Sequence, residues 1–397
     1  MLKKTIEILQ KPLYVGIILT IITILITAQS FLLGSKTFCG DVEYTHYNNY
    51  KIFAESYFHL IENKDLYLLY PNEHFDYYKY SPTFALIMAP FAYLPEAFGL
   101  FFWNLLNVLV LFLAIWKLPF QSTKTRLFIL SIILIELITS IQNSQSNALI
   151  AGLIVLAFIF LEKKQIALAS LFIVLTVFIK IFGIVAFVLF LFYPDKLKAF
   201  VYTIGWTFFF LALPLLVISP NQLNFLYHNW LNLLSSDHSA SDGISVAGCL
   251  QSFFDTDISK NIIVLLGAIL FIIPAFQFRY YKDKIFRMLF LSSTLIWVVI
   301  FNHKAESPTF IIAMTGVAVW FCSQKRKTEN VVLLILAVVL TVLSPTDIFP
   351  KGLRDDYINP FKLKALPCIL IWLKIVYDLT TFGLKNNKHE RTTRVLL

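Results

Sequence analysis

The sequence predicts an all-α fold, a polytopic transmembrane helical bundle, and three observations lead to this prediction. Of the 397 residues, 58% are hydrophobic and only 14% are charged. Apolar runs follow one another almost end to end, as expected where every backbone polar group must be hydrogen-bonded inside lipid. The formal charge of +9 comes from basic residues that concentrate in alternate connections between these runs. That distribution is typical of membrane topology and argues against a protein that binds nucleic acid.

Each apolar run is interpreted as a helix, which gives a bundle of about 11–13 spans, several of them shorter than the usual ~20 residues. The predicted spans are residues 13–34, 98–117, 127–141, 147–161, 165–179, 182–193, 198–219, 261–278, 285–301, 308–322, 330–345 and 365–383. Residues 82–95 form an extra apolar stretch between Pro82 and Pro95. We interpret it as a half-helix in the outer leaflet, with a full span as the alternative.

The basic residues also predict the orientation of the chain. With the N-terminus inside, the inner segments contain 21 Lys and Arg residues and the outer segments contain 11. The run after Lys3, Lys4 and Lys11 is too long for a signal-peptide core and no A-x-A site follows it, so we expect a retained first helix. We predict one integral domain, residues 1–397, in the cytoplasmic membrane with both termini in the cytoplasm.

The predicted non-cytoplasmic side then carries most of the reactive groups. It contains the first loop, residues 35–80, which is expected to include short amphipathic helices, and the loops 219–260 and 344–364. The first loop is rich in Asp, Glu, His, Asn, Lys and Tyr, and we interpret it as the catalytic loop. Neither HExxH nor another compact metal pattern occurs, so we expect no metal and no other cofactor.

Two similar motifs start apolar helices on this side. KYSPTF (79–84) and KAESPTF (304–310) both place Ser-Pro two or three residues after a lysine. Ser is a good N-cap, and Pro fits the first turn because its missing N–H costs nothing there. The positive end of such a helix suits an anion, and Lys79 or Lys304 would add charge. The alternative is that Ser-Pro only starts each helix.

Other polar residues lie at the ends of apolar runs. Lys180 either snorkels to the headgroups or faces a polar cavity, where Glu136 is a plausible partner. Gln145 and Asn147 offer amide groups that suit sugar hydroxyls, with helix capping as the alternative.

Three further residues are candidates for the site. His303 could be a base or, when protonated, a phosphate partner, and an ordinary interfacial histidine is the alternative. Glu306 follows it closely in the sequence NHKAE. The ring of Tyr80, like others of the tyrosine-rich first loop, could stack on a sugar or rest at the headgroups.

The order of these pieces resembles glycosyltransferase family 87, membrane mannosyltransferase-like enzymes of the GT-C superfamily. The resemblance lies in the segments NYKIFAES (49–56), DLY (65–67), KYSPTFALIMAPFAYLP (79–95), FFWNLLNVLVLFLAI (101–115), QSNALIAGLIVLAF (145–158) and IKIFG (179–183). It covers the first half of the chain better than the second. It implies transfer of a sugar, such as the hexose mannose, from a polyprenyl-phosphate donor to a hydroxyl of a glycan, glycolipid or protein. The implied reaction inverts the anomeric centre on the non-cytoplasmic face.

The resemblance also implies an acidic residue in the first loop as the base. At the matching position this chain has Asn49, which cannot take a proton, and Ser81 and Ile181 stand where the family has Pro. The catalytic candidates are Asp41, Asp76, Glu55 and His303, and substrate or phosphate binding is assigned to Asn49, Lys79, Tyr80, Gln145, Asn147, Lys180, Lys304 and Glu306. The alternatives are a transporter or flippase of lipid-linked saccharides, for which we find no convincing inverted repeat, and an inactive homologue.

Overall fold

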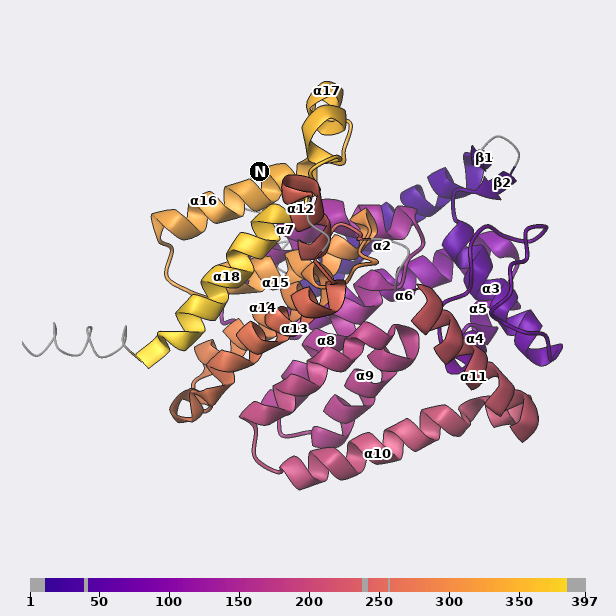
Figure 1. Ribbon diagram of the computed structural model, residues 1–397, viewed down its shortest axis with the longest axis horizontal. Coiled ribbons are helices and arrows are strands. Elements are labelled where there is room, and N and C mark those ends of the chain that lie inside the picture. The colour runs from indigo at the N-terminus through magenta and orange to yellow at the C-terminus, as the bar shows by residue number, and fades with distance from the viewer. Residues whose placement is uncertain (1–10, 39–41, 238–241, 256–257, 384–397) are drawn as a thin grey trace, which may run out of the picture. The chain divides into compact units, whose positions relative to one another are not determined.

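The computed structural model describes residues 11–38, 42–237, 242–255 and 258–383, and these residues are mostly helical (Figure 1). The all-α prediction is confirmed except for one small hairpin in the first loop, in which β1 (Ser35–Phe38) pairs antiparallel with β2 (Val42–Thr45). We expected only short helices there. Each strand of the hairpin is only four residues long, SKTF and VEYT, which is too short for a reliable alternating pattern.

The chain divides into two compact units. The first unit comprises Met1–Ile184 and Leu197–Ala240, and the second comprises Val185–Lys196 and Ser241–Leu397. The elements from the first half of the chain are α2 (Pro12–Leu32), α3 (Asn48–Ile61), α4 (Pro82–Ile87), α5 (Ala89–Ala92), α6 (Glu96–Lys117), α7 (Thr123–Gln142), α8 (Asn147–Glu162), α9 (Ile166–Ile179) and η1 (Ile181–Phe192). Those from the second half are α10 (Lys196–Ala212), η2 (Leu213–Leu216), α11 (Pro220–Asp237), α12 (Val246–Phe254), α13 (Lys260–Ile272), η3 (Ile273–Phe276), η4 (Phe278–Tyr280), α14 (Lys284–Ile300), η5 (Ser307–Thr309), α15 (Phe310–Ser323), α16 (Thr328–Leu336), η6 (Ala337–Leu343), α17 (Lys351–Leu353), η7 (Arg354–Ile358) and α18 (Leu366–Thr380).

The helices lie close to the predicted spans. In the described part of the chain, four are long and apolar enough to cross a membrane, namely α2, α6, α7 and α10 with η2, and several shorter apolar helices accompany them. Exposed apolar side chains on α2, such as Leu13 and Leu25, are those that lipid would cover. The protein is therefore a helical membrane protein, and the number of crossings stays a prediction.

The stretch between Pro82 and Pro95 is not one continuous helix. It forms α4, of six residues, and α5, of four. Both are far shorter than the ~20 residues that a span needs, and the placement of this stretch in the outer leaflet stays a prediction. Ser81 caps α4 as predicted, since its Oγ accepts a hydrogen bond from the N–H of Phe84 (3.2 Å).

Helix α8 forms the centre of the first unit. It is apolar all round and buried along nearly its whole length, packed against α6 and α9. A helix of this kind requires close neighbours on every side. Gly152 allows this approach to α6, because a Cβ there would lie 2.9 Å from the backbone nitrogen of Leu111. The first residue of α8, Asn147, is therefore fixed in position by the packing of the helix behind it.

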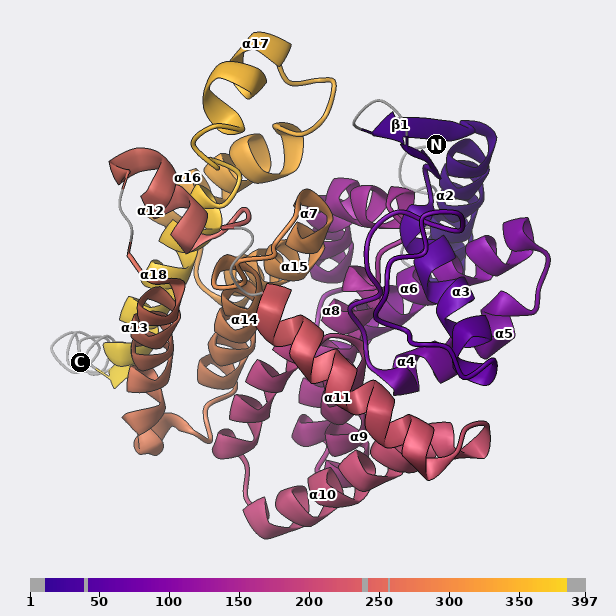
Figure 2. The same ribbon diagram turned by 45° about the vertical axis from the view of Figure 1, so that its right-hand side comes forward.

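Helix α11 packs across the first loop. The predicted loop 219–260 contains this 18-residue helix, which lies beside α4 (Figures 1 and 2). Asn229 donates to the carboxylate of Asp65 (2.8 Å), and the indole of Trp230 donates to the backbone oxygen of Lys79 (3.2 Å). Gln222 donates to the backbone oxygen of Asn63 (3.0 Å). The helix thereby fixes both ends of the segment between α3 and α4.

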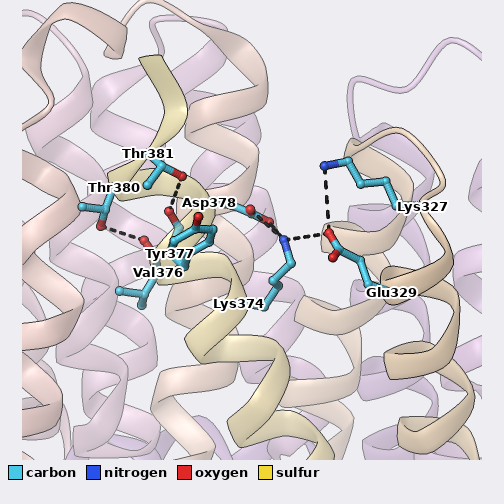
Figure 3. Close-up of polar contacts among 8 residues, drawn as sticks. All are labelled: Lys327, Glu329, Lys374, Val376, Tyr377, Asp378, Thr380 and Thr381. Atoms are coloured by element: carbon cyan, nitrogen blue, oxygen red, sulfur yellow. Dashed lines mark hydrogen bonds and ion pairs between the residues drawn. The ribbon is translucent and has the colours of Figure 1, made fainter. Parts of the chain in front are cut away.

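In the second unit, α14 packs against α15 and α18. Trp372 of α18 donates from its indole nitrogen to the hydroxyl of Ser293 on α14 (3.0 Å). Lys374 lies two residues further along α18 and contacts Asp378 of the same helix and Glu329 of α16 (Figure 3). The predicted loop 344–364 contains the short helices α17 and η7.

Candidate functional site

Lys180 is the centre of a polar cluster in the first unit. Helix α9 ends at Ile179, and the extended backbone of Lys180 turns its side chain away from the helix axis. Its Nζ donates to the amide oxygens of Gln145 (3.1 Å) and Asn147 (2.9 Å). The ammonium also lies 5.7 Å from the ring centre of Tyr80, which is within cation–π range. Four residues predicted to bind substrate therefore meet, although they come from three separate segments.

The turn before α8 adds further donors to this cluster. Asn147 is fully buried, and its Nδ2 has no hydrogen-bond partner within the described residues. The same is true of the hydroxyls of Ser144 and Ser146 in the turn, again counting only the described part of the chain. Buried donors of this kind cost free energy unless a partner is supplied. Together with the positive end of α8, they suit a ligand that carries oxygen atoms and negative charge.

Asn49 lies next to this turn. Its Nδ2 donates to the backbone oxygen of Asn143 (2.9 Å), and Trp103 donates to the backbone oxygen of Ser144 (2.9 Å). These bonds tie the start of α3 and the side of α6 to the loop that leads into α8. The sequence resemblance thus places the family's carboxylate position beside the Lys180 cluster, where this chain has an amide.

Asp76 and Lys79 form an ion pair with each other. Their side chains lie 3.2 Å apart, and both are partly exposed. The backbone of Asp76 is in the left-handed region, with φ 78°, and its carboxylate accepts the N–H of Tyr77 (2.7 Å). A non-glycine residue in this region is uncommon and is often found at functional sites. The predicted base and one predicted phosphate ligand are thus neighbours.

Glu55 belongs to another face of α3. It is six residues from Asn49, which corresponds to about 240° around the helix axis and about 9 Å along it. It lies 3.8 Å from Lys51, which also contacts Glu96 at the start of α6 (3.2 Å). Burial, together with the charge of Glu96, raises the pKa of the nearby Tyr47 to about 12. Glu55 is therefore part of a charged network between α3 and α6 rather than of the Lys180 cluster.

The remaining candidates belong to the second unit or lie outside the described residues. Glu306 is the N-cap of η5 and forms a capping box with Thr309, whose Oγ1 accepts the N–H of Glu306 (3.2 Å). Our expectation that Ser307 would cap this helix is wrong, because the acidic residue before it satisfies the free N–H groups. The N–H of Lys304 donates to the side chain of Asn302 (2.9 Å), and His303 lies between these two residues. Asp41 lies outside the described residues.

Sequence reasoning missed a histidine cluster inside the first loop. His59 is buried, with Nε2 2.6 Å from the carboxylate of Glu73, and the ring of Tyr70 lies 3.9 Å from its own ring. His74 is buried nearby, and its pKa is lowered by burial and then by the charge of His59. His59 lies on the buried face of α3, and its helical spacing from the apolar residues of that face was the one sequence signal for this cluster. The contacts of His59 with Tyr70 and Glu73 form because the loop folds back onto α3, and no sequence pattern indicates that fold.

The fold and the cluster together define a class: a helical membrane protein with a cationic, amide-rich site suited to a substrate with phosphate and hydroxyl groups. Comparison with protein families specifies that class further. A sequence model of glycosyltransferase family 87 matches residues 78–345, which is more than half of the chain. The chain belongs to glycosyltransferase family 87, and it is accordingly a membrane glycosyltransferase. A search of curated proteins found no match.

The matched range differs from the one we expected. It extends through most of the second half of the chain, where we expected only a weak resemblance. It begins at Tyr78, so Lys79, Tyr80, Gln145, Asn147 and Lys180 lie inside it. The segment from Asn49 to Asp76 precedes it, and the assignment of Asn49 to the family's acidic position therefore rests on the sequence motif alone.

Proposed function

We propose that this protein transfers a sugar, a hexose such as mannose, from a polyprenyl-phosphate donor to an acceptor hydroxyl. The acceptor is a glycan, a glycolipid or a protein, and the reaction inverts the anomeric centre without a metal or other cofactor. The observation that carries this proposal is the contact of Lys180 with Gln145 and Asn147 beside the ring of Tyr80.

The chemistry of the donor explains why a lysine is needed there. As the acceptor oxygen attacks the anomeric carbon, the bond from that carbon to the phosphate oxygen breaks, and its electron pair goes to the phosphate. The lipid phosphate therefore gains negative charge in the transition state, and a fixed cation stabilises it most at that point. The amide oxygens of Gln145 and Asn147 orient the Lys180 ammonium for this contact. The N-terminus of α8 adds positive potential from the same side.

The neutral groups of the cluster suit the sugar. The buried Nδ2 of Asn147 and the hydroxyls of Ser144 and Ser146 are donors for sugar oxygens. The face of Tyr80 offers an apolar surface on which a sugar ring can stack. Asn49 adjoins this turn through its hydrogen bond to Asn143, so it is the residue of α3 assigned to contact the donor.

The acceptor hydroxyl loses its proton to a base as the attack proceeds. The candidates for this base stay Asp76, Glu55, Asp41 and His303. Lys79, Lys304 and Glu306 are assigned to further substrate contacts. The distribution of basic residues supports a site on the non-cytoplasmic face of the cytoplasmic membrane, with both termini in the cytoplasm.

An inactive homologue is the second candidate. Asn49 favours it, because an amide cannot remove a proton and its nitrogen already donates to the backbone of Asn143. Transport of a lipid-linked saccharide without transfer is the other alternative. Both predict binding of the donor without release of lipid phosphate.

The test is an assay of the purified protein with a panel of polyprenyl-phosphate sugars and a mixture of membrane glycolipids as acceptors. We expect release of polyprenyl phosphate with at least one sugar, and the product should carry the sugar with inverted configuration. Binding of the donor with no release across the whole panel would contradict the proposal. Sealed vesicles that move the donor across the bilayer without cleaving it would instead support a flippase.

A further inference from the structure

We propose that Asn48 is a positioning residue for Asp76. It holds Asp76 so that the Asp76 carboxylate takes the role of the family's acidic residue, at whose position this chain has Asn49. This inference rests on the proposed function. It concerns a hydrogen-bonded pair in the first loop, Asn48 with the backbone of Phe75. Asn48 directly precedes Asn49 at the start of α3, and Phe75 directly precedes Asp76.

The amide of Asn48 binds both backbone groups of Phe75. Its Nδ2 donates to the Phe75 oxygen (2.6 Å), and its Oδ1 accepts the Phe75 N–H (2.9 Å). Only a side-chain amide supplies a donor and an acceptor at this spacing, because a carboxylate has no donor at neutral pH. Two bonds fix the orientation of the peptide as well as its position. The start of α3 therefore determines where the residue after Phe75 lies.

The backbone of Asp76 supports the same interpretation. Its φ of 78° is unfavourable for a residue with a side chain, and Asp tolerates it better than most because its carboxylate accepts a local N–H. Such a conformation persists only where the surrounding contacts determine it. Here Asn48 fixes the residue before Asp76, and Trp230 fixes the backbone of Lys79 after it (3.2 Å).

The resulting carboxylate is available for chemistry. The side chain of Asp76 is about half exposed, and the ammonium of Lys79 lies 3.2 Å from its carboxylate. Glu55, in contrast, lies on another face of α3 in a network with Lys51 and Glu96. The segment that carries Asp76 is thus hydrogen-bonded, through Phe75, to the end of α3 at which the family resemblance expects a carboxylate.

The first experiment tests the positioning without any substrate. Hydrogen exchange of the backbone amides is measured on the full-length protein and on Asn48→Ala. We expect exchange at residues 73–79 to become at least about tenfold faster, because the N–H of Phe75 loses its acceptor. Unchanged exchange in this segment would overturn the inference. Exchange in α8 serves as the internal control for the fold.

The second experiment tests the carboxylate by rescue, with the donor that the panel identifies. We expect Asp76→Asn to lower kcat about 100-fold and Asn48→Ala to lower it about tenfold, with KM changed little. Adding Asn49→Asp should restore most of the activity in both backgrounds, because it returns a carboxylate to the start of α3. A residue with only a structural role would not be rescued in this way.

The matched control is Glu62→Gln, which removes a carboxylate from an exposed ion pair with Lys64 in the same loop. We expect its kcat to be unchanged. If the wild type is active and Asp76→Asn is fully active as well, this inference alone is overturned. The same holds if Asn49→Asp does not restore activity to a folded Asp76→Asn variant. A wild-type protein that turns over no member of the panel would overturn the proposed function together with it.

Discussion

Lys180 directly follows the apolar helix α9, Lys374 lies within the apolar helix α18, and the two lysines have different partners. Lys180, in the first unit, donates to the amide oxygens of Gln145 and Asn147. Lys374, in the second unit, contacts the carboxylates of Asp378 (2.7 Å) and Glu329 (3.3 Å) (Figure 3). Each also lies beside a tyrosine ring, at 5.7 Å from Tyr80 and 5.9 Å from Tyr377. The two ammonium groups thus each lie near a tyrosine ring, and their hydrogen bonds described here go to amide oxygens at Lys180 and to carboxylates at Lys374.

The difference shows how a charge in an apolar environment is used. Two carboxylates neutralise the Lys374 ammonium and join α16 to α18, so that its contribution is to stability. An amide oxygen accepts a hydrogen bond from an ammonium and sets its direction. The contacts of Lys180 with Gln145 and Asn147 thus position the cation for a phosphate. The comparison predicts that replacing Lys180 lowers the rate of turnover, and that replacing Lys374 lowers the stability of the fold.

Replacing Lys180 should have the largest effect. We expect Lys180→Met to lower kcat/KM for the polyprenyl-phosphate donor about 100-fold, because the departing phosphate loses one fixed cation. The measurement is release of polyprenyl phosphate by the purified variant. Lys374→Met is the matched control, and its kcat/KM should equal that of the wild type. Equal losses in both variants would remove the distinction between the two sites.

Replacing Lys374 should act on stability instead. We expect Lys374→Met to lower the free energy of unfolding by about 2 kcal/mol, because the Asp378 carboxylate, whose side chain is only 5% exposed, loses this ammonium. Denaturant unfolding in detergent micelles measures the change. The double variant Lys374→Met/Asp378→Leu should recover most of the loss. No recovery would mean that Lys374 contributes through packing rather than through its charge.

The sequence was sufficient to predict the helices and one of these two sites. Apolar runs predict helix positions because a membrane leaves the backbone few alternatives. Lys180, Gln145 and Asn147 were each predicted to bind substrate because they lie at the ends of predicted spans, although the partner predicted for Lys180 was Glu136. The Ser81 cap of α4 follows from local chemistry alone.

Contacts made by folding of the loops could not be predicted. The bonds between Asn48 and Phe75 and between His59 and Glu73 join residues that are far apart along a polar segment with little periodicity. Helix α11 was taken for a loop, because its 18 residues mix polar and apolar side chains without a long apolar run. Such a helix is stabilised by tertiary contacts, here with Asp65 and the backbone of Lys79, rather than by its composition.

A carboxylate placed beside Lys180 would give it the kind of partner that Lys374 has, and this change tests the comparison directly. Asn147→Asp places a carboxylate where an amide oxygen now lies 2.9 Å from the Lys180 ammonium. We expect the donor affinity to fall about tenfold, because the new carboxylate places a negative charge beside the ammonium and repels phosphate. Equilibrium binding of the donor measures this. Gln142→Glu, the same kind of change in a partly exposed residue just before this turn, is the control and should leave the affinity unchanged. Retained affinity in Asn147→Asp would show that the phosphate does not contact Lys180.

The smallest effect should come from the tyrosine rings that the two sites share. We expect Tyr80→Leu to weaken donor binding about threefold, because it removes a ring face from the Lys180 ammonium, whereas Tyr80→Phe retains that face and should bind normally. The exposed Tyr377 gives the matched test in the second unit, where Tyr377→Leu should leave both binding and the unfolding midpoint unchanged. If Tyr80→Phe weakened binding as much as Tyr80→Leu, the hydroxyl rather than the ring would be the contributing group. Tyr80 would then contribute to donor binding through its hydroxyl rather than through its ring face.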